Sequence, residues 1–91
     1  MIRIRRSKGE IINEGVDEKK TVEERRKLAK GLLHNKDYDT LKTMINDSDR
    51  WVRYWVAYGL IDNKDFDTLK TMINDSDDDV KYYVARGLND I

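Results

Sequence analysis

The chain has 91 residues, of which 40% are charged and 38% are hydrophobic. This length and composition predict one modest core that buries roughly 60–65% of the unfolded chain's surface, and they argue against disorder throughout. The absence of cysteine excludes a disulfide scaffold, a thiolate metal site and a cysteine nucleophile. No apolar run approaches the ~18 residues of a membrane span, and no apolar stretch follows the first charges as in a signal peptide. We therefore expect a cytoplasmic protein that does not associate with membranes.

The charges balance at 18 positive and 18 negative, but they are distributed unevenly along the chain. Residues 1–30 hold ten Lys or Arg and six Asp or Glu, a net charge of +4. Residues 31–91 hold eight and twelve, a net charge of −4. Every acid in this second part is Asp, which is favoured at helix N-caps and in turns. The pattern predicts short helices with many ends.

Residues 1–16 form a basic N-terminal segment that differs from the rest of the chain. Ile alternates with Arg over residues 2–5, a turn-like segment follows at residues 7–9, and residues 11–12 are both Ile. This pattern is compatible with a small β-hairpin or with a frayed basic tail, and both interpretations stay open. An isolated hairpin is marginal in water, so it would have to lie against a helix or a partner.

Residues 17–91 form the second region, and its first element is a helix that begins after Thr21. Thr21 and Glu24 have the spacing of a capping box, in which each side chain bonds the other residue's backbone N–H. The apolar residues of this predicted helix are Val22, Leu28, Ala29, Leu32 and Leu33. We interpret residues 17–34 as a partial repeat that supplies only the second helix of a unit.

An internal repeat follows and is the most informative feature of the sequence. Residues 35–62 read NKDYDTLKTMINDSDRWVRYWVAYGLID, and residues 63–90 match them at 21 of 28 positions. The motif A-x-G-L recurs in the same register at Ala29, Ala57 and Ala85. A period of this length predicts stacked supersecondary units that bury their apolar faces only against one another. The repeats are 35–62 and 63–91.

Each unit has helical rather than alternating apolar spacing. The first run predicts a helix of about two to three turns that ends before Asp47 and carries Tyr38, Leu41, Met44 and Ile45. The second run predicts an amphipathic helix whose core stripe is Val52, Trp55, Val56, Gly59 and Leu60. Each complete unit is therefore predicted to be a helical hairpin.

Polar residues with short side chains precede both predicted helices. Asp37 or Asp39 is expected to cap the first helix, and Ser48 or Asp49 the second. The same roles fall in the last unit to Asp65, Asp67, Ser76 and Asp77.

A glycine lies near the C-terminal end of each long helix, at Gly31, Gly59 and Gly87. A mid-helix Gly costs ~1 kcal/mol relative to Ala. Either the missing side chain allows a neighbouring helix to approach, or the helix begins to unwind there. We favour close packing, because a Leu that continues the apolar stripe follows each Gly.

The segment Ile45–Asp49, followed by Val52-Arg53, Val56-Ala57 and Gly59-Leu60, resembles HEAT-like repeats of the type found in bilin lyases. The resemblance covers residues 21–91 and implies an all-α fold, a right-handed solenoid of about two and a half helical hairpins. It implies no common chemistry. The period is shorter than in that family, the usual Pro after the D-x-D loop is missing, and Gly replaces Ala before the Leu. In such solenoids the second helices line the concave face, which places Tyr54, Tyr58 and Tyr82 near a binding groove.

The residues offer little for catalysis, so we predict that the chain is not an enzyme and binds no metal or cofactor. The single histidine, His34, follows the first helix and is expected to be solvated. Ser48 and Ser76 belong to the repeated loops, where capping accounts for them. Asp75-x-Asp77-x-Asp79 resembles the start of a calcium loop but lacks the following Gly and the bidentate Glu.

The positions at which the two repeats differ supply the candidate site. Arg50, Trp51, Arg53, Trp55, Tyr58 and Ile61 become Asp78, Asp79, Lys81, Tyr83, Arg86 and Asn89. The middle helix has two packed flanks and the terminal helix one, which explains this difference by packing alone. The other interpretation is an exposed patch of aromatic and Arg residues of the kind that anchors protein interfaces. Its candidate residues are Arg50, Trp51, Arg53, Tyr54, Tyr58, Tyr82 and Arg86.

The predicted function is a non-catalytic protein–protein interaction module, an adaptor or a small inhibitor. Self-association is a further expectation, since a short solenoid leaves helix flanks uncovered. The alternative is nucleic-acid binding through the basic residues Arg3, Arg5, Arg6, Lys8, Arg25 and Arg26. The net charge of −4 over residues 31–91 opposes that alternative, and the basic residues from Arg25 to Lys30 also fit an ordinary solvated helix face.

Overall fold

The computed structural model describes residues 20–89, and the elements in this part of the chain are helices joined by turns. They are α2 (Val22–His34), α3 (Tyr38–Lys42), α4 (Arg50–Asp62), α5 (Phe66–Lys70) and α6 (Asp78–Asn89). The all-α prediction is confirmed for these residues, among which there is no strand. The predicted hairpin or tail at 1–16 lies outside them. No helix in the described part is long and apolar enough to cross a membrane.

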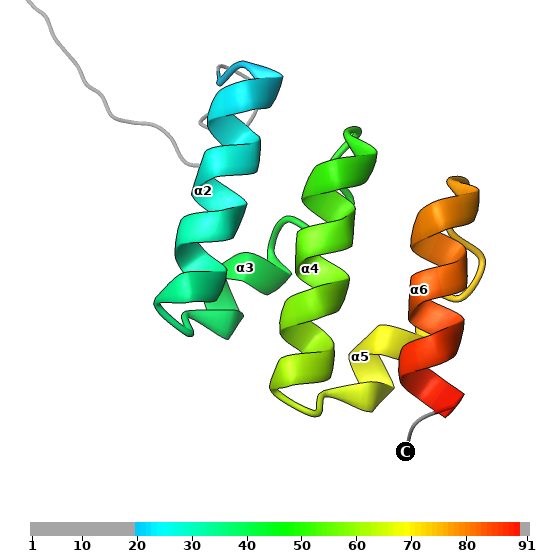
Figure 1. The fold of residues 1–91 in the computed structure, drawn as a ribbon. Helices are drawn as coiled ribbons and strands as arrows, with labels where there is room; N and C mark the ends of the chain where they lie inside the picture. Colours follow the sequence, from blue (N-terminus) through cyan, green and yellow to red (C-terminus); the bar gives the residue numbers. More distant parts are fainter. Residues whose placement is uncertain (1–19, 90–91) are drawn as a thin grey trace, which may run out of the picture.

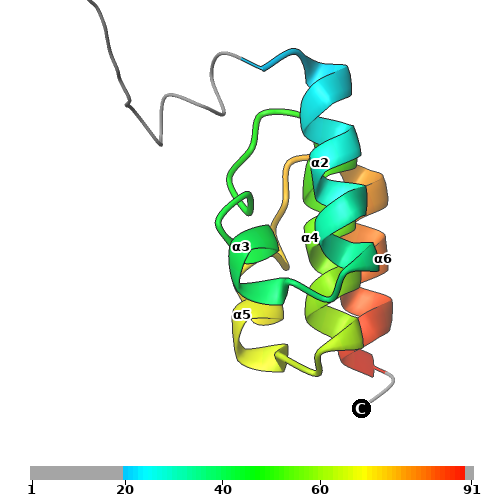
Figure 2. The ribbon, with the colours of Figure 1, turned by 90° about the vertical axis from the view of Figure 1, so that its left-hand side faces the viewer.

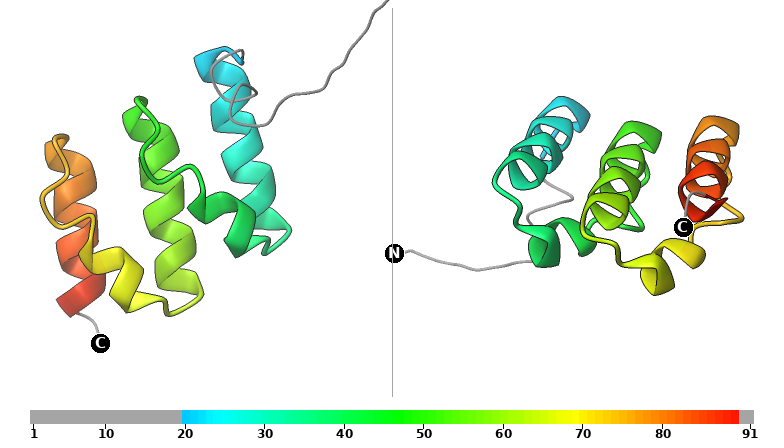
Figure 3. Two further views of the ribbon diagram at one scale, coloured as in Figure 1. Left: turned by 180° about the vertical axis from the view of Figure 1, so that it is seen from behind. Right: turned by 60° about the horizontal axis from the view of Figure 1, so that its bottom comes forward.

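The long helices α2, α4 and α6 lie side by side and run in the same direction (Figure 1). The short helices α3 and α5 lie together on one side of this layer (Figure 2). Each short helix contacts the long helices that precede and follow it in the chain. Figure 3 shows the same connection twice, from the end of one long helix through a short helix to the start of the next.

The helix N-termini are capped as the sequence predicts. Thr21 and Glu24 form the full capping box, with Thr21 N donating to Glu24 Oε1 at 2.9 Å and Glu24 N to Thr21 Oγ1 at 3.1 Å. Of the paired alternatives, the Asp directly before each helix accepts a hydrogen bond from a backbone N–H of the first turn. These caps are Asp37 to Thr40 N, Asp49 to Val52 N, Asp65 to Thr68 N and Asp77 to Val80 N.

The first helix of each unit is shorter than predicted. We expected two to three turns, but α3 ends at Lys42 and the chain continues in tighter turns. Thr43 N bonds Thr40 O at 3.1 Å, and Met44 N bonds Leu41 O at 3.0 Å. The Thr43 hydroxyl also donates to Thr40 O at 2.6 Å. A side chain that bonds the preceding carbonyl competes with the α-helical pattern, and the spacing of three residues still keeps Leu41 and Met44 buried.

The core lies between the two layers and consists of small and medium aliphatic side chains. It comprises Ala29, Leu41, Met44, Val52, Val56, Ala57, Leu60, Leu69, Met72, Val80 and Val84. The predicted stripe of α4 is confirmed at Val52, Val56 and Leu60, whereas Trp55 is only half-buried. Val22, which we assigned to the apolar face of α2, is 38% exposed because it lies in the first turn of the helix.

Two of the three helix glycines lie in close contact with a neighbouring helix, and the third has no such contact. A Cβ on Gly59 would lie 2.5 Å from Leu41 Cδ2, and one on Gly87 would lie 2.5 Å from Ile61 Cδ1. The close-packing prediction is therefore confirmed at these two positions. It is wrong at Gly31, which has nothing within 4 Å of the corresponding position. All three helices continue beyond their glycine, so the unwinding alternative is wrong.

Candidate functional site

One arginine on α2 and one on α4 each bond to the loop that precedes the next long helix. Arg25 Nε donates to Asp47 Oδ2 at 2.9 Å, and Arg53 Nε donates to Asp75 Oδ2 at the same distance. Each guanidinium also donates to a backbone carbonyl, of Lys20 from Arg25 and of Asp47 from Arg53. The Arg53 side chain is only 13% exposed. These two pairs, which we call the Arg–Asp ladder, recur with the 28-residue period and link successive units.

Two further arginines reinforce the same junctions. Arg26 holds both oxygens of Asp49, at 2.9 and 2.8 Å, and Arg50 Nη1 lies 3.2 Å from Asp77 Oδ1. The Arg26 guanidinium and the Val52 N–H both lower the pKa of Asp49. The pKa of Asp77 is lowered chiefly by its capping hydrogen bond and then by Arg50. These carboxylates therefore serve as helix caps and ion-pair partners at once.

Three of the arginines that we placed in functional surfaces have structural partners instead. Arg53 was a candidate for the exposed patch, but its guanidinium lies in the ladder, because α6 brings Asp75 within reach. Arg25 and Arg26 were candidates for phosphate contacts, and both bond loop carboxylates. The solvated-face interpretation is also wrong at Arg25, whose side chain is largely buried. The remaining basic candidates of that alternative, Arg3, Arg5, Arg6 and Lys8, lie outside the described residues.

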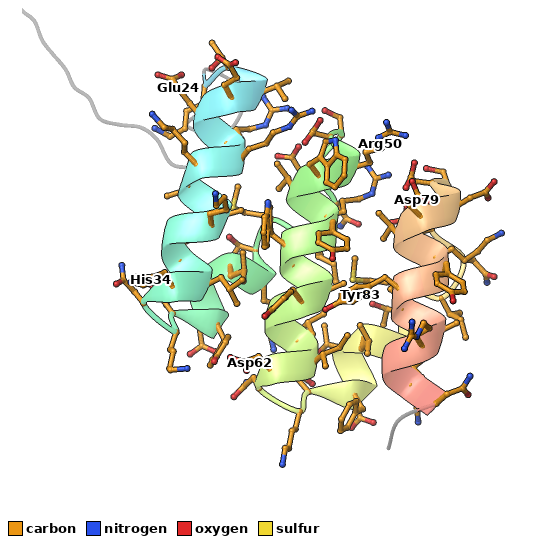
Figure 4. All side chains as sticks on the ribbon, in the orientation of Figure 1. Glu24, His34, Arg50, Asp62, Asp79 and Tyr83 are labelled. Atoms are coloured by element: carbon orange, nitrogen blue, oxygen red, sulfur yellow. The ribbon has the colours of Figure 1, made fainter. Side chains whose placement is uncertain are left out.

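Aromatic side chains form a continuous cluster on the side of α4 opposite its buried stripe. Adjacent ring centroids are 5.9 Å apart between Trp51 and Tyr54 and 6.0 Å apart between Trp55 and Tyr58. The cluster extends to α6 through Tyr54 and Tyr83, whose centroids are 4.7 Å apart. Figure 4 shows Tyr83 between α4 and α6. Burial raises the pKa of Tyr83 to about 12, with smaller contributions from its neighbours.

The cluster divides between the two interpretations that the sequence left open. Tyr54 and Tyr83 are half-buried and pack against the core, so packing between helices accounts for them. Trp51, Tyr58 and Tyr82 are 43%, 42% and 65% exposed. These three side chains therefore leave a substantial part of their apolar area on the surface.

Each long helix contributes one cation that lies over an aromatic ring, either of the same helix or of the next one. Lys30 Nζ is 5.8 Å from the centroid of Trp55, Arg50 Cζ is 5.8 Å from that of Trp51, and Arg86 Cζ is 6.0 Å from that of Tyr82. Such contacts orient the cation and partly desolvate it. We call this surface the outer face; it comprises Lys30, Arg50, Trp51, Tyr54, Trp55, Tyr58, Tyr82, Tyr83 and Arg86.

A hollow of about 420 Å³ opens beside the outer face, between α2 and α4. Its lining residues are Lys30, Leu33, His34, Lys36, Trp55, Tyr58 and Asp62. A larger and more polar hollow, of about 670 Å³, lies between the loops at residues 45–48 and 74–76. That second hollow is lined by loop residues and by members of the Arg–Asp ladder.

The polar groups of residues 20–89 lie at or near the surface. Within this range no charged or polar residue is completely buried, and no group of three His, Asp or Glu side chains could hold a metal ion. His34 is exposed at the end of α2 (Figure 4). The Tyr38 hydroxyl donates to Asp62, and this hydrogen bond raises the pKa of Tyr38.

Comparison with known proteins gives no relative: no family model, no curated protein and no solved structure matches the chain. The resemblance to HEAT-like repeats therefore remains a prediction from the sequence.

Proposed function

We propose that the chain is a short HEAT-like solenoid that acts as a non-catalytic protein-binding module, an adaptor or a small inhibitor. Its contact surface is the outer face of the long helices. The observation that carries this proposal is the exposure of Trp51, Tyr58 and Tyr82 on that face, with Arg50 and Arg86 beside them. Trp, Tyr and Arg are the residue types most enriched among those that dominate binding energy in protein interfaces.

The rigidity of the outer face supports the proposal. Tyr54 and Tyr83 pack against each other between α4 and α6, with their rings tilted by 36°, and Trp55 packs on the core. The exposed rings therefore stand on a fixed base, and aromatic side chains have few torsions to lose on binding. A surface that is already ordered loses less entropy when a partner docks.

The use of the polar groups supports a non-catalytic role. Asp47, Asp49, Asp75 and Asp77 are occupied by arginines or by helix N-termini. A catalytic carboxylate or base needs a protonation state suited to proton transfer and access to a substrate. In this protein the shifted carboxyl pKa values are lowered by caps and ion pairs, which is typical of structural groups.

The parallel long helices and the repeated ladder support the solenoid part of the proposal. Each ladder pair spans 22 residues and joins consecutive units, as expected for a stack in which each unit contacts only its neighbours. We do not adopt the nucleic-acid alternative, because two of its candidate residues, Arg25 and Arg26, neutralise Asp47 and Asp49.

The test compares partner capture by the native chain and by the double variant Trp51→Asp, Tyr58→Arg. The last unit carries Asp79 and Arg86 at the equivalent positions of α6, and Trp51 and Tyr58 are partly exposed, so neither new charge has to be fully buried. A matched control, Asp39→Asn with Asp67→Asn, changes two exposed positions on α3 and α5. We expect proteins of the native host to be captured by the native chain and the control, and lost by the double variant.

Equal capture by the double variant would show that the outer face is not the contact surface. Loss of capture by the control alone would instead assign the surface to α3 and α5. Thermal unfolding of each variant by circular dichroism separates loss of binding from loss of fold.

A further inference from the structure

The hollow between α2 and α4 has a chemical character of its own. Trp55 and Tyr58 form an aromatic wall, with ring centroids 6.0 Å apart, and Leu33 adds an aliphatic surface. Lys30 and Lys36 contribute permanent positive charges. His34 and Asp62 lie at the same ends of α2 and α4 (Figure 4). The hollow thus combines an apolar wall with a rim of mostly basic groups.

The hollow is built largely from positions that the repeat does not preserve. The residues 28 positions after Lys30, His34 and Trp55 are Tyr58, Asp62 and Tyr83. The equivalent place between α4 and α6 therefore has different residues, and Asp62 occupies the position that His34 has in α2. Lys36 recurs as Lys64, and Leu33 and Trp55 keep their apolar or aromatic type, so the residues that distinguish this hollow from the equivalent place are Lys30, His34 and Tyr58.

The charges around the hollow favour an anionic ligand. Two lysines face a single carboxylate, Asp62, which already accepts from the Tyr38 hydroxyl and has Lys36 Nζ 3.8 Å away. The carbonyls at the end of α2 are also occupied, because Lys36 N bonds Leu33 O and Asp37 N bonds Leu32 O.

We propose that this hollow binds an acidic peptide segment of a partner protein, with one aromatic or aliphatic side chain against Trp55 and Tyr58 and flanking carboxylates near Lys30 and Lys36. This inference rests on the proposed protein-binding function and specifies the chemistry of its partner. A volume of about 420 Å³ accommodates one large side chain with neighbouring backbone. The cations lie at the rim, so they select the charge of the partner more than they add affinity.

A peptide fits the hollow better than a nucleic acid does. Single-stranded nucleic acids bind along positively charged grooves that follow several phosphates. The hollow itself holds two lysines, Lys30 and Lys36, and the acid Asp62, and Arg50 of the outer face is paired with Asp77. The positive area is therefore local and suits a few carboxylates at one point of a folded or extended chain.

The test uses a blocked hexapeptide with Leu-Phe between two pairs of Glu, and a counterpart with Lys in place of Glu. Titration of ¹⁵N-labelled protein distinguishes the indole signals of Trp51 and Trp55. We expect the acidic peptide to shift the signals of Trp55 and of the backbone at Lys30 and Tyr58. The basic peptide should leave them unchanged.

A charge reversal at the rim gives the matched comparison. The double variant Lys30→Glu, Lys36→Glu should bind the acidic peptide about tenfold more weakly, the result of removing two favourable charge contacts and adding two unfavourable ones. Lys64→Glu is the control, because Lys64 occupies the place of Lys36 in the next unit and has the same positive φ, 58° against 59°. This control should bind as the native chain does.

Equal binding of both peptides by the native chain would overturn the proposal, whether or not the double variant folds. Shifts at these residues with a ten-residue oligothymidylate but not with the acidic peptide would also overturn it, in favour of a nucleic-acid site. Failure of both ligands, together with successful partner capture that depends on Trp51 and Tyr58, would reject the peptide site and leave the proposed function in place.

Discussion

At the scale of single residues, the arginines that the sequence suggested for binding fall into two groups. Arg53 lies between two units with Asp75 and the carbonyl of Asp47, so its side chain holds the stack together. Arg50 has an exposed side chain over Trp51, and its ion pair with Asp77 lies at the surface. The same residue type thus has different roles one helical turn apart.

This contrast predicts unequal costs of truncation. Arg53→Ala should lower the free energy of unfolding by about 1.5–3 kcal/mol, because it removes charged hydrogen bonds and leaves the Asp75 carboxylate with the Asp77 N–H as its remaining donor. Arg50→Ala should change stability within the error of the measurement, since exposed ion pairs contribute little. Urea unfolding of both variants is the measurement, and equal losses would contradict the assignment of Arg53 to the stack.

The glycines provide a second prediction, with opposite signs at equivalent positions. Gly31→Ala should raise the free energy of unfolding by up to ~1 kcal/mol, because Ala favours the helix and has nothing within 4 Å to meet. Gly87→Ala should lower it by about 1–3 kcal/mol, because the new methyl group would lie 2.8 Å from Ile61 Cγ1. Thermal unfolding distinguishes them; a gain in stability at Gly87 would contradict the close packing of α4 and α6.

At the scale of elements, helix starts and apolar faces were predictable from the sequence, and pairings between units were not. Asp37 and Asp49 are recognisable because capping is a local interaction within four residues. The partner of Arg53 lies 22 residues away, and its identity depends on how one unit rotates against the next. The recurrence of Arg25 and Asp47 as Arg53 and Asp75 is a sequence feature compatible with these ion pairs. The repeat alone does not identify which residues are in contact.

Helix length was the other element-level failure. The apolar spacing at Leu41 and Met44 fits an α-helix and also fits successive turns of three residues, because both keep these side chains on one side. The Thr43 hydroxyl, bonded to Thr40 O, decides between them. Of the candidate site, the spacing singled out Trp51 and Tyr58 but left open whether they are packed or exposed, and Tyr82 was included because of the resemblance to HEAT-like repeats. The hollow beside Lys30 was not, because it needs the distance between α2 and α4.

The capping aspartates predict a loss of stability in acid. A carboxyl whose pKa is lower in the folded than in the unfolded state contributes stability above its ordinary pKa, here 3.8, and loses it as the pH falls through the lowered value. The melting temperature should therefore decline from about pH 5 to pH 2.

The variant Asp49→Asn isolates one contribution to that decline. Asn still caps α4, but it cannot titrate or form the ion pair with Arg26. We expect a lower melting temperature than the native chain at pH 7 and a shallower dependence on pH. An unchanged slope would show that Asp49 does not contribute to acid unfolding.

At the scale of the whole molecule, the last unit keeps apolar residues of the middle unit on the side that faces away from α4, where they are exposed. Ile73 is 45% exposed, whereas its equivalent Ile45 packs against the core, and Tyr82 is more exposed than its equivalent Tyr54. Asp78 and Asp79 add charge to the start of α6. The flank is therefore partly apolar and partly polar, and self-association through it stays a prediction.

A stack of this kind predicts that an added unit increases stability. Inserting a second copy of residues 35–62 before residue 63 creates one further ladder pair and one further buried junction. In a linear array, stability grows with the number of interfaces between neighbours, so the melting temperature should rise. Calorimetry checks this, and a fall in melting temperature or two separate transitions would contradict the proposed solenoid.

The most direct test of the central claim is an NMR map of the labelled chain bound to a captured partner. We expect signals of the outer face, including those of Trp51, Tyr58 and Tyr82, to change on binding. Signals of α3 and α5, including Asp39 and Asp67, should remain unchanged. Changes confined to the short helices would contradict the claim that this protein binds through the outer face of its long helices.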